Sequence, residues 1–224
     1  MNHFNICVPE VAKVTYWSDA TDEFKGITLS KNRRTFMQKV FHQDEVWTSQ
    51  FCLCANPTNR WQLILRLLCL LFEISGHGII WFLYASVKCC LTNSWDEAVL
   101  LAVVLLLDIL VIAPVKVIFK RKRPELDSGK MLGSVSQIDE YAFPSGHASR
   151  AVAITMLYVV MFSLSPMATT LWIMWAVGVC LSRVLLGRHH VIDVIVGMMV
   201  GFLVYWLLNI SIPFLHEANL LVTV

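Results

Sequence analysis

His189 and Asp193 stand four residues apart near the start of an apolar run. At that spacing on a helix, the carboxylate can accept a hydrogen bond from one imidazole nitrogen and leave the other as an oriented nucleophile or base. Arg183 precedes His189 by six residues, so the two side chains can meet at one site only if the chain turns near Gly187. Taken alone, such a His–Asp pair is more often a structural hydrogen bond than a site.

A second motif, Pro144-Ser145-Gly146-His147, comes directly before an apolar run that begins at Ala148. A proline and a small hydroxyl residue favour a helix start, and the free backbone N–H groups at a helix N-terminus bind phosphate oxygens. Gly146 would let an anion approach closely, and His147 beside it could hold or give a proton near neutral pH. A helix cap with an incidental histidine explains this short motif equally well.

Lys116 and Arg123 are seven residues apart, so on a helix they return to nearly the same face, with Lys120 close to that stripe. Pro124 discourages the helix from continuing. Two cations therefore converge at the end of one element, where they could bind an anionic group. The alternative is the ordinary basic flank of a transmembrane helix.

The composition indicates which elements must position these motifs. Of the 224 residues, 57% are hydrophobic and 15% are charged, and the mean hydropathy is +0.63, whereas a soluble domain carries about 25% charged residues. Much of the surface must therefore face lipid, which excludes a water-soluble enzyme. The net charge of +2 does not favour nucleic acid as a partner. The seven cysteines lack a repeated spacing and are interpreted as packing thiols, not as a zinc site or disulfide framework.

The apolar runs predict an all-α polytopic membrane helix bundle, because crossing the hydrocarbon takes about 20 helical residues. Single spans are predicted at residues 98–118, 148–164, 171–186 and 192–212. The run 61–91 is interrupted by Glu73 and by Ser75-Gly76-His77-Gly78, so it is either one kinked span or a hairpin of two short helices. Five or six spans result.

Residues 1–60 are predicted to form a polar, partly amphipathic N-terminal tail, and residues 61–224 the membrane-embedded domain. The tail has no apolar segment typical of a secretory signal. Within residues 31–51, Phe36, Val40 and Phe41 recur at helical intervals beside basic residues, as in an amphipathic helix on a membrane surface. A solvated tail with a short helix is an equal alternative.

Counting the spans places all three motifs on one side of the membrane. The first motif follows the run 98–118, the second starts the next run, and two runs joined by SPMATT return the chain to the third. Together the motifs would supply basic side chains, helix-start amides, two histidines and an aspartate. This set fits a phosphate pocket with a nucleophile and an acid, and it includes no cysteine or carboxylate cluster for a metal.

The ordered pattern K-x6-RP, PSGH and SR-x5-H-x3-D, from Lys116 to Asp193, resembles the type 2 phosphatidic acid phosphatase (PAP2) superfamily, which includes glucose-6-phosphatase and vanadium haloperoxidases. The resemblance implies a PAP2/haloperoxidase-like fold and a hydrolase acting on phosphate esters. Within the superfamily, FEISGHGIIWFLY, SRVLLGRHHVIDV and the basic tail resemble the polyisoprenoid diphosphate phosphatases of the presqualene diphosphate phosphatase type. That branch implies a polyisoprenoid diphosphate substrate and a location in the endoplasmic reticulum and nuclear envelope.

The superfamily resemblance also implies roles for individual residues. His189 would take the phosphoryl group as a phosphohistidine, Asp193 would orient it, and His147 would protonate the leaving oxygen and then activate water. Five positions would hold the phosphate oxygens, namely Lys116, Arg123, Ser145, Gly146 and Arg183. No metal and no cofactor are implied. His190 lies beside the nucleophile, but the offsets from Arg183 and to Asp193 both favour His189.

Other readings of the same motifs stay open. A broad phosphatidate phosphatase or a lipid phosphotransferase would carry them too, whereas a non-catalytic membrane scaffold is disfavoured because every chemical residue is present. Ser75-Gly76-His77 lacks a proline and partners, so it is interpreted as a helix break and not as a second catalytic site. Three extra cations, Lys120, Lys122 and Arg188, could bind a second phosphate or anchor the protein to the membrane. Isoprenoid length and oligomeric state stay open.

The distribution of lysine and arginine predicts the orientation in the membrane. These residues gather in the tail and in the loop after residue 118, while the loops at 92–97 and 165–170 and the C-terminal end hold none. If the run 61–91 crosses once, the tail and the catalytic motifs share a side, and the positive-inside tendency makes that side cytosolic. The C-terminus would then be lumenal.

Overall fold

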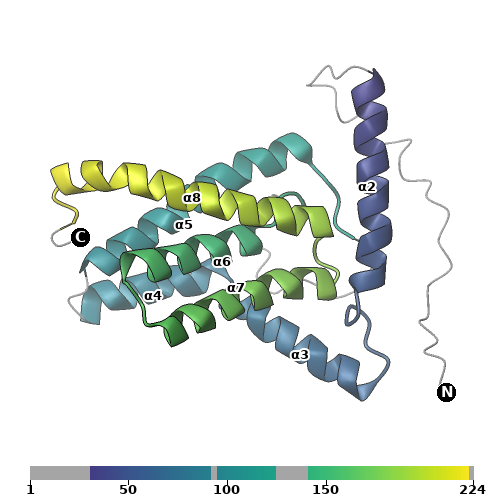
Figure 1. Cartoon of the computed structure of the whole chain (residues 1–224), viewed down its shortest axis with the longest axis horizontal. Helices are drawn as coiled ribbons and strands as arrows, with labels where there is room; N and C mark the ends of the chain where they lie inside the picture. The colour runs from purple at the N-terminus through teal and green to yellow at the C-terminus, as the bar shows by residue number, and fades with distance from the viewer. Residues whose placement is uncertain (1–30, 92–94, 125–140, 222–224) are drawn as a thin grey trace.

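The computed structural model describes residues 31–91, 95–124 and 141–221. All regular elements in these ranges are helical, which confirms the predicted all-α architecture (Figure 1). In chain order they are α2 (Lys31–Phe51), α3 (Arg60–Ser75), α4 (Gly78–Leu91), α5 (Trp95–Phe119), α6 (Gly146–Met156), its π-helical continuation (Leu157–Met161), α7 (Pro166–Leu185) and α8 (Val191–Glu217).

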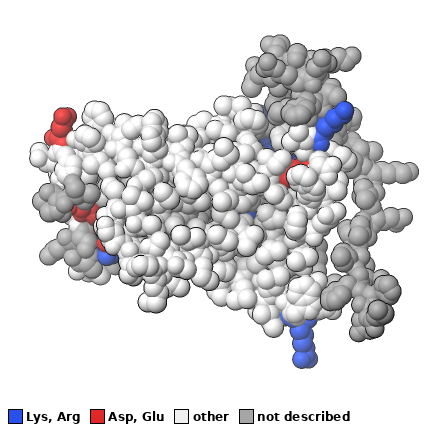
Figure 2. Space-filling view, viewed as in Figure 1, with Lys and Arg blue, Asp and Glu red and all other residues white. Residues whose placement is uncertain are grey.

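The bundle has the surface of an integral membrane protein. Helices α5, α7 and α8 are long and apolar enough to cross a membrane. They leave large side chains such as Leu110, Met174 and Phe202 exposed, and such a surface is stable where it faces lipid. Figure 2 shows that the charged side chains visible on one face gather toward the two ends of the molecule.

Helices α3 and α4 form a further apolar unit that is bent by 49° at the break between Ser75 and Gly78. A bend of this size is not a reversal of direction, so the pair continues as one broken unit, which favours the kinked-span alternative for residues 61–91 over the hairpin (Figure 1). Counting this pair, the described residues contain four candidate spans by length and composition. The α6 unit, Gly146–Met161, is a shorter apolar helix, and the predicted total of five or six spans stays a prediction.

Helix α6 is the buried centre of the bundle, and α8 packs directly on its backbone. Gly197 and Gly201 make this approach possible, because a Cβ at either position would lie 2.5 Å from the carbonyl oxygen of Ser145 or Ser149, respectively. Two small residues four apart are a common way for helices to pack closely within a membrane. The contact places the start of α6, with the PSGH motif, beside the start of α8.

Helix α2 crosses the end of the bundle at which α7 ends and α8 begins (Figure 1). Asp44 and Thr48, on its inward face, are buried, whereas Trp47 and Phe51 are about half exposed. A helix that lies across the end of a membrane bundle with apolar side chains on its outer face fits the predicted surface helix better than a solvated tail.

Candidate active site

The three sequence motifs meet at the end of the bundle that α2 covers. The backbone N–H of Ser145, in the second motif, donates to the carbonyl oxygen of Asp193, in the third, over 2.9 Å. Arg123, in the first motif, donates through Nη1 to the carbonyl oxygen of Arg188 over 2.9 Å and lies 3.2 Å from Nε2 of His189. Groups far apart in the chain are thus held in one buried site.

The turn expected near Gly187 brings Arg183 and His189 together. Gly187 has a φ of 69°, in the left-handed region that glycine adopts without steric cost. After this turn, the backbone N–H groups of Arg188 and His189 donate to the carbonyl oxygen of Arg183 over 3.0 and 3.2 Å. The chain therefore doubles back, as the six-residue spacing required.

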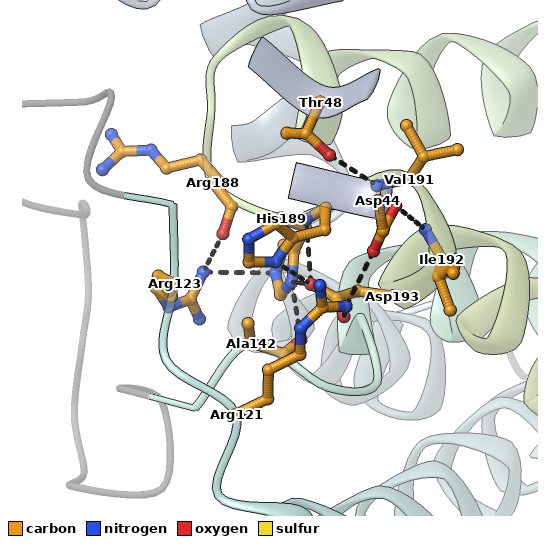
Figure 3. Close-up of polar contacts among 11 residues, drawn as sticks. Asp44, Thr48, Arg121, Arg123, Ala142, Arg188, His189, Val191, Ile192 and Asp193 are labelled. Atoms are coloured by element: carbon orange, nitrogen blue, oxygen red, sulfur yellow. Dashed lines mark hydrogen bonds and ion pairs between the residues drawn. The ribbon is translucent and has the colours of Figure 1, made fainter. Parts of the chain in front are cut away.

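The hydrogen bonds of His189 define which of its nitrogens can react. Its Nδ1 lies 2.7 Å from the carbonyl oxygen of Ala142, and because a carbonyl only accepts, Nδ1 must carry the proton. The lone pair is then on Nε2, which faces the guanidinium of Arg123 (Figure 3). An anion bound by that guanidinium would lie next to the unprotonated nitrogen of His189.

Asp193 differs from its expected arrangement. Its Oδ2 accepts from the backbone N–H of His190 over 2.8 Å and lies 3.0 Å from Nδ1 of the same residue, but it is 3.9 Å from Nδ1 of His189. The reason is where α8 begins. His190 is the N-cap residue and Asp193 the third helical residue of a capping box, so His189 lies outside the helix and the assumed i, i+4 geometry does not apply. The Asp193 carboxylate therefore lies near the His189 ring without a direct hydrogen bond to it.

The surroundings of His189 favour its neutral form. The residue is 1% exposed, and burial lowers the pKa of its imidazole well below 6.5, with Arg123, Arg183 and Lys116 acting in the same direction. A buried imidazole among three cations resists a further positive charge. The surroundings of His189 thus favour an imidazole without a positive charge.

The PSGH motif opens α6, with Ser145 as the N-cap residue. The Oγ of Ser145 and the Nε2 of His147 are buried and have no hydrogen-bond partner within the described ranges. Buried polar groups in native proteins are nearly always hydrogen-bonded, so two that lack a partner indicate a place where a ligand could bind. Together with the N–H groups at the start of α6, they are suited to the oxygens of a bound phosphate.

Two residues that the sequence reasoning did not place in the site lie beside it. Glu73 is buried, with Oε1 2.9 Å from Nη1 of Arg183 and 3.8 Å from Nε of Arg188. The ring of His77 meets that of His147 edge to face, with centroids 5.8 Å apart. The sequence did contain a signal for Glu73, because a carboxylate inside an apolar run is energetically costly unless it has a partner.

The remaining predicted cations are distributed around this centre. Lys116 is 5% exposed at the end of α5 and is close enough to His189 to affect its pKa. Arg188 is buried, whereas Lys120 and Lys122 are exposed. Of the three extra cations suggested for a second phosphate, Arg188 alone has its side chain buried beside the site.

Comparisons with known proteins show which proteins the chain is similar to. One relative, described as "Probable lipid phosphate phosphatase beta" from Arabidopsis thaliana, is 35% identical over 123 residues, which cover 43% of this chain and 57% of that protein. The chain thus spans a little over half the length of this curated relative.

Two solved structures have a similar fold. The Aquifex aeolicus LpxE structure has a TM-score of 0.54 and 19% identity, covering 71% of this chain and 92% of the other. The Bacillus subtilis "PAP2 type phosphatidylglycerolphosphate phosphatase" has a TM-score of 0.58 and 23% identity, covering 76% and 85%. Residues 97–216, more than half of the chain and including every motif residue discussed above, match the model of the PAP2 superfamily, so this protein belongs to the PAP2 superfamily.

Proposed function

We propose that this protein is an integral membrane phosphatase that hydrolyses lipid phosphates through a phosphohistidine on His189. The observation that carries the proposal is the orientation of this side chain, whose Nδ1–H is held by Ala142 while Nε2 faces Arg123. A neutral imidazole nitrogen directed at a phosphate-binding cation is the arrangement that nucleophilic attack on phosphorus requires.

In the proposed reaction, the Nε2 lone pair forms a bond to phosphorus as the bond to the leaving oxygen breaks. His147, which must take up a proton beside the bound phosphate anion, gives that proton to the leaving oxygen. It then takes a proton from water, which attacks the phosphohistidine and releases inorganic phosphate. Asp193 stabilises the positive charge that develops on His189. The phosphate oxygens would be held by Lys116, Arg123, Arg183, Ser145 Oγ and the Gly146 amide. The three cations among them would supply the charge stabilisation that a metal ion provides in other phosphoryl transfers.

The proposed substrates are polyisoprenoid diphosphates such as presqualene, farnesyl or geranylgeranyl diphosphate. Two observations support this choice. The segments FEISGHGIIWFLY and SRVLLGRHHVIDV resemble that branch, and they contain Glu73 and Arg188, which contact each other beside the site. Arg188 supplies a cation beyond those needed for one phosphate. A lipid tail could extend along the apolar side chains that face the bilayer.

Phosphate release by the purified protein in detergent, with EDTA present, tests the reaction and the substrate together. The panel is presqualene, farnesyl and geranylgeranyl diphosphates, phosphatidate and glucose 6-phosphate, with His189→Ala as the inactive control. We expect the isoprenoid diphosphates to be hydrolysed fastest. A clear preference for phosphatidate would contradict the proposed substrate class but not the phosphatase reaction. Transfer of phosphate to an added alcohol would indicate a phosphotransferase. No turnover of any substrate would contradict the proposal that the protein is an enzyme.

We further propose that the protein resides in the endoplasmic reticulum and nuclear envelope, with the site facing the cytosol. The bent α3–α4 unit and the contact of α2 with the start of α8 support placing the N-terminal tail and the site on the same side of the membrane. The concentration of basic residues in these parts supports the cytosolic side.

A further inference from the structure

Two side chains of α2 bind the N-terminus of α8, although they precede it by more than 140 residues. Asp44 accepts through Oδ1 from the backbone N–H of Ile192 over 3.1 Å, and Thr48 accepts through Oγ1 from that of Val191 over 3.2 Å (Figure 3). The first N–H groups of a helix have no partner within the helix. Helix α2 therefore supplies part of the cap of α8, at the point where Asp193 is placed.

A shared guanidinium connects α2 to the catalytic carboxylate. The Nη1 of Arg121 lies 2.8 Å from Oδ2 of Asp44 and 2.6 Å from Oδ1 of Asp193. The arginine side chain is 8% exposed, and both carboxylates are fully buried. Its guanidinium carbon also lies 4.4 Å from the ring centroid of Phe41 on α2. Arg121 is therefore packed between α2 and α8 and is paired with an acid on each.

The electrostatics explain why Arg121 lies between the two acids, Asp44 and Asp193. Two buried carboxylates close together repel each other unless a cation lies between them, and Arg121 supplies that cation. Asp44, His190 and Asp193 place their ligand atoms within 4.8 Å of one another, a spacing that a metal ion could also use. Because the guanidinium already bonds both carboxylates, the geometry favours a side-chain bridge over a metal ligand set.

From these contacts we propose that α2 is a positioning element of the active site, in which Asp44, Thr48 and Arg121 hold the N-terminus of α8 and thereby Asp193 and His189. None of the three residues lies in the PSGH motif or in the K-x6-RP and SR-x5-H-x3-D signature positions. The inference rests on the proposed phosphatase reaction for its kinetic readout, but its structural part can be measured without any substrate.

Two substitutions separate the two kinds of contact. Asp44→Asn keeps an oxygen that can accept from Ile192 but removes the charge that pairs with Arg121. Thr48→Val keeps the shape of the side chain but removes the acceptor for Val191. The matched controls on the same helix are Glu45→Gln, which removes a neighbouring carboxylate charge, and Ser49→Ala, which removes an exposed hydroxyl.

The full-length variants are compared in detergent by kcat and KM on the best substrate of the panel and by amide hydrogen exchange at residues 188–194. We expect Asp44→Asn to lower kcat by about 10- to 100-fold with KM within about twofold, because a small misplacement of a reacting group has effects of this size. Thr48→Val should lower kcat less, by roughly threefold to tenfold, through loss of one cap. Both should speed exchange at residues 188–194, and the two controls should match the wild type.

Each outcome has one meaning. Faster exchange with unchanged kcat would make α2 a structural support only and overturn the proposal, as would wild-type behaviour of both variants in both measurements. Activity lost in EDTA and restored by Zn²⁺ or Mn²⁺ would assign Asp44, His190 and Asp193 to a metal and overturn it too. If the wild type hydrolyses no substrate, the proposed function fails, while the exchange data still decide whether α2 orders the start of α8.

Discussion

The Nδ1 of His189 lies 2.7 Å from the carbonyl oxygen of Ala142, a residue 47 positions earlier in the chain. The loop before the PSGH motif thus orients the imidazole that the SR-x5-H-x3-D motif provides. A backbone acceptor selects the Nδ1–H tautomer without carrying a charge, which leaves Asp193 to pair with Arg121 and His190. The two motifs are therefore coupled in the structure, because the loop before one of them determines which nitrogen of His189 is unprotonated.

The adjacent histidines should differ sharply in their importance. His189→Ala removes the proposed nucleophile, so we expect less than about 0.1% of wild-type kcat/KM, as for other removed nucleophiles. His190→Ala keeps the nucleophile and loses one contact to Asp193, so it should retain activity within about tenfold of wild type. Both variants are assayed after their melting temperatures show that they are folded.

A trapping experiment separates the nucleophile from the acid. An acid-labile phosphoenzyme should accumulate from a labelled diphosphate in His147→Ala, where water is no longer activated, and should be absent in His189→Ala. If the activity effects of His189→Ala and His190→Ala were reversed, the assignment of the nucleophile would be off by one residue.

The pH dependence should report the environment of His189. Burial first, then Arg123, Arg183 and Lys116, lower the pKa of its imidazole, so we expect the proposed nucleophile to be protonated, and activity to be lost, only at a pH below the usual range of histidine. Arg123→Gln removes one of these cations and should raise that pKa, which moves the acid limb of kcat/KM to higher pH as well as lowering the maximum. Using one substrate for both proteins cancels the titration of the substrate phosphate.

Arg60→Gln, a charge loss at an exposed position at the start of α3, is the matched control and should leave the profile in place. An acid limb at the same pH in the wild type and Arg123→Gln would show that a group other than His189 controls it.

Glu73 should contribute to kcat/KM, because its carboxylate is paired with the buried guanidinium of Arg183. Glu73→Gln keeps the shape but removes the charge, and we expect kcat/KM to fall by about 10- to 100-fold, the size seen when outer partners of a binding group are lost. Glu97 provides a control at the opposite end of the bundle, where it pairs with Lys88 over 2.7 Å and accepts from Tyr158 over 2.8 Å. Glu97→Gln should lower thermal stability and leave kcat/KM near wild type; equal kinetic losses in both variants would show only a general loss of packing.

Topology mapping should place the N-terminal tail and the site on one side of the membrane and the C-terminal end on the other. Helix α8 starts at the site and runs for 27 residues, about 40 Å at 1.5 Å per residue, which exceeds the roughly 30 Å of hydrocarbon. In sealed microsomes, tags at Met1 and Asp127 should be open to protease from the cytosol, and a tag after Val224 should be protected. Protection of the first two tags with exposure of the third would invert the orientation, and opposite sides for Met1 and Asp127 would contradict a single crossing by α3 and α4.

The sequence by itself determined the membrane character, the helical class and the identity of the motif residues. Composition and hydropathy are sums over the chain, and the motif SR-x5-H-x3-D is defined by residues close together in the sequence. Neither kind of information depends on knowing the fold. The turn at Gly187 also followed from local spacing, because Arg183 and His189 could meet in no other way.

Only the tertiary structure decided which groups hold the motif residues in place. Ala142 orients His189, Glu73 pairs with Arg183, and Asp44 caps α8 from 148 residues away. None of these pairings has a sequence spacing that predicts it, since they form where separate helices pack at one end of the bundle. The arrangement of Asp193 was missed for a related reason. Helix α8 begins at Val191, so His189 lies outside the helix and the carboxylate of Asp193 contacts His190 instead.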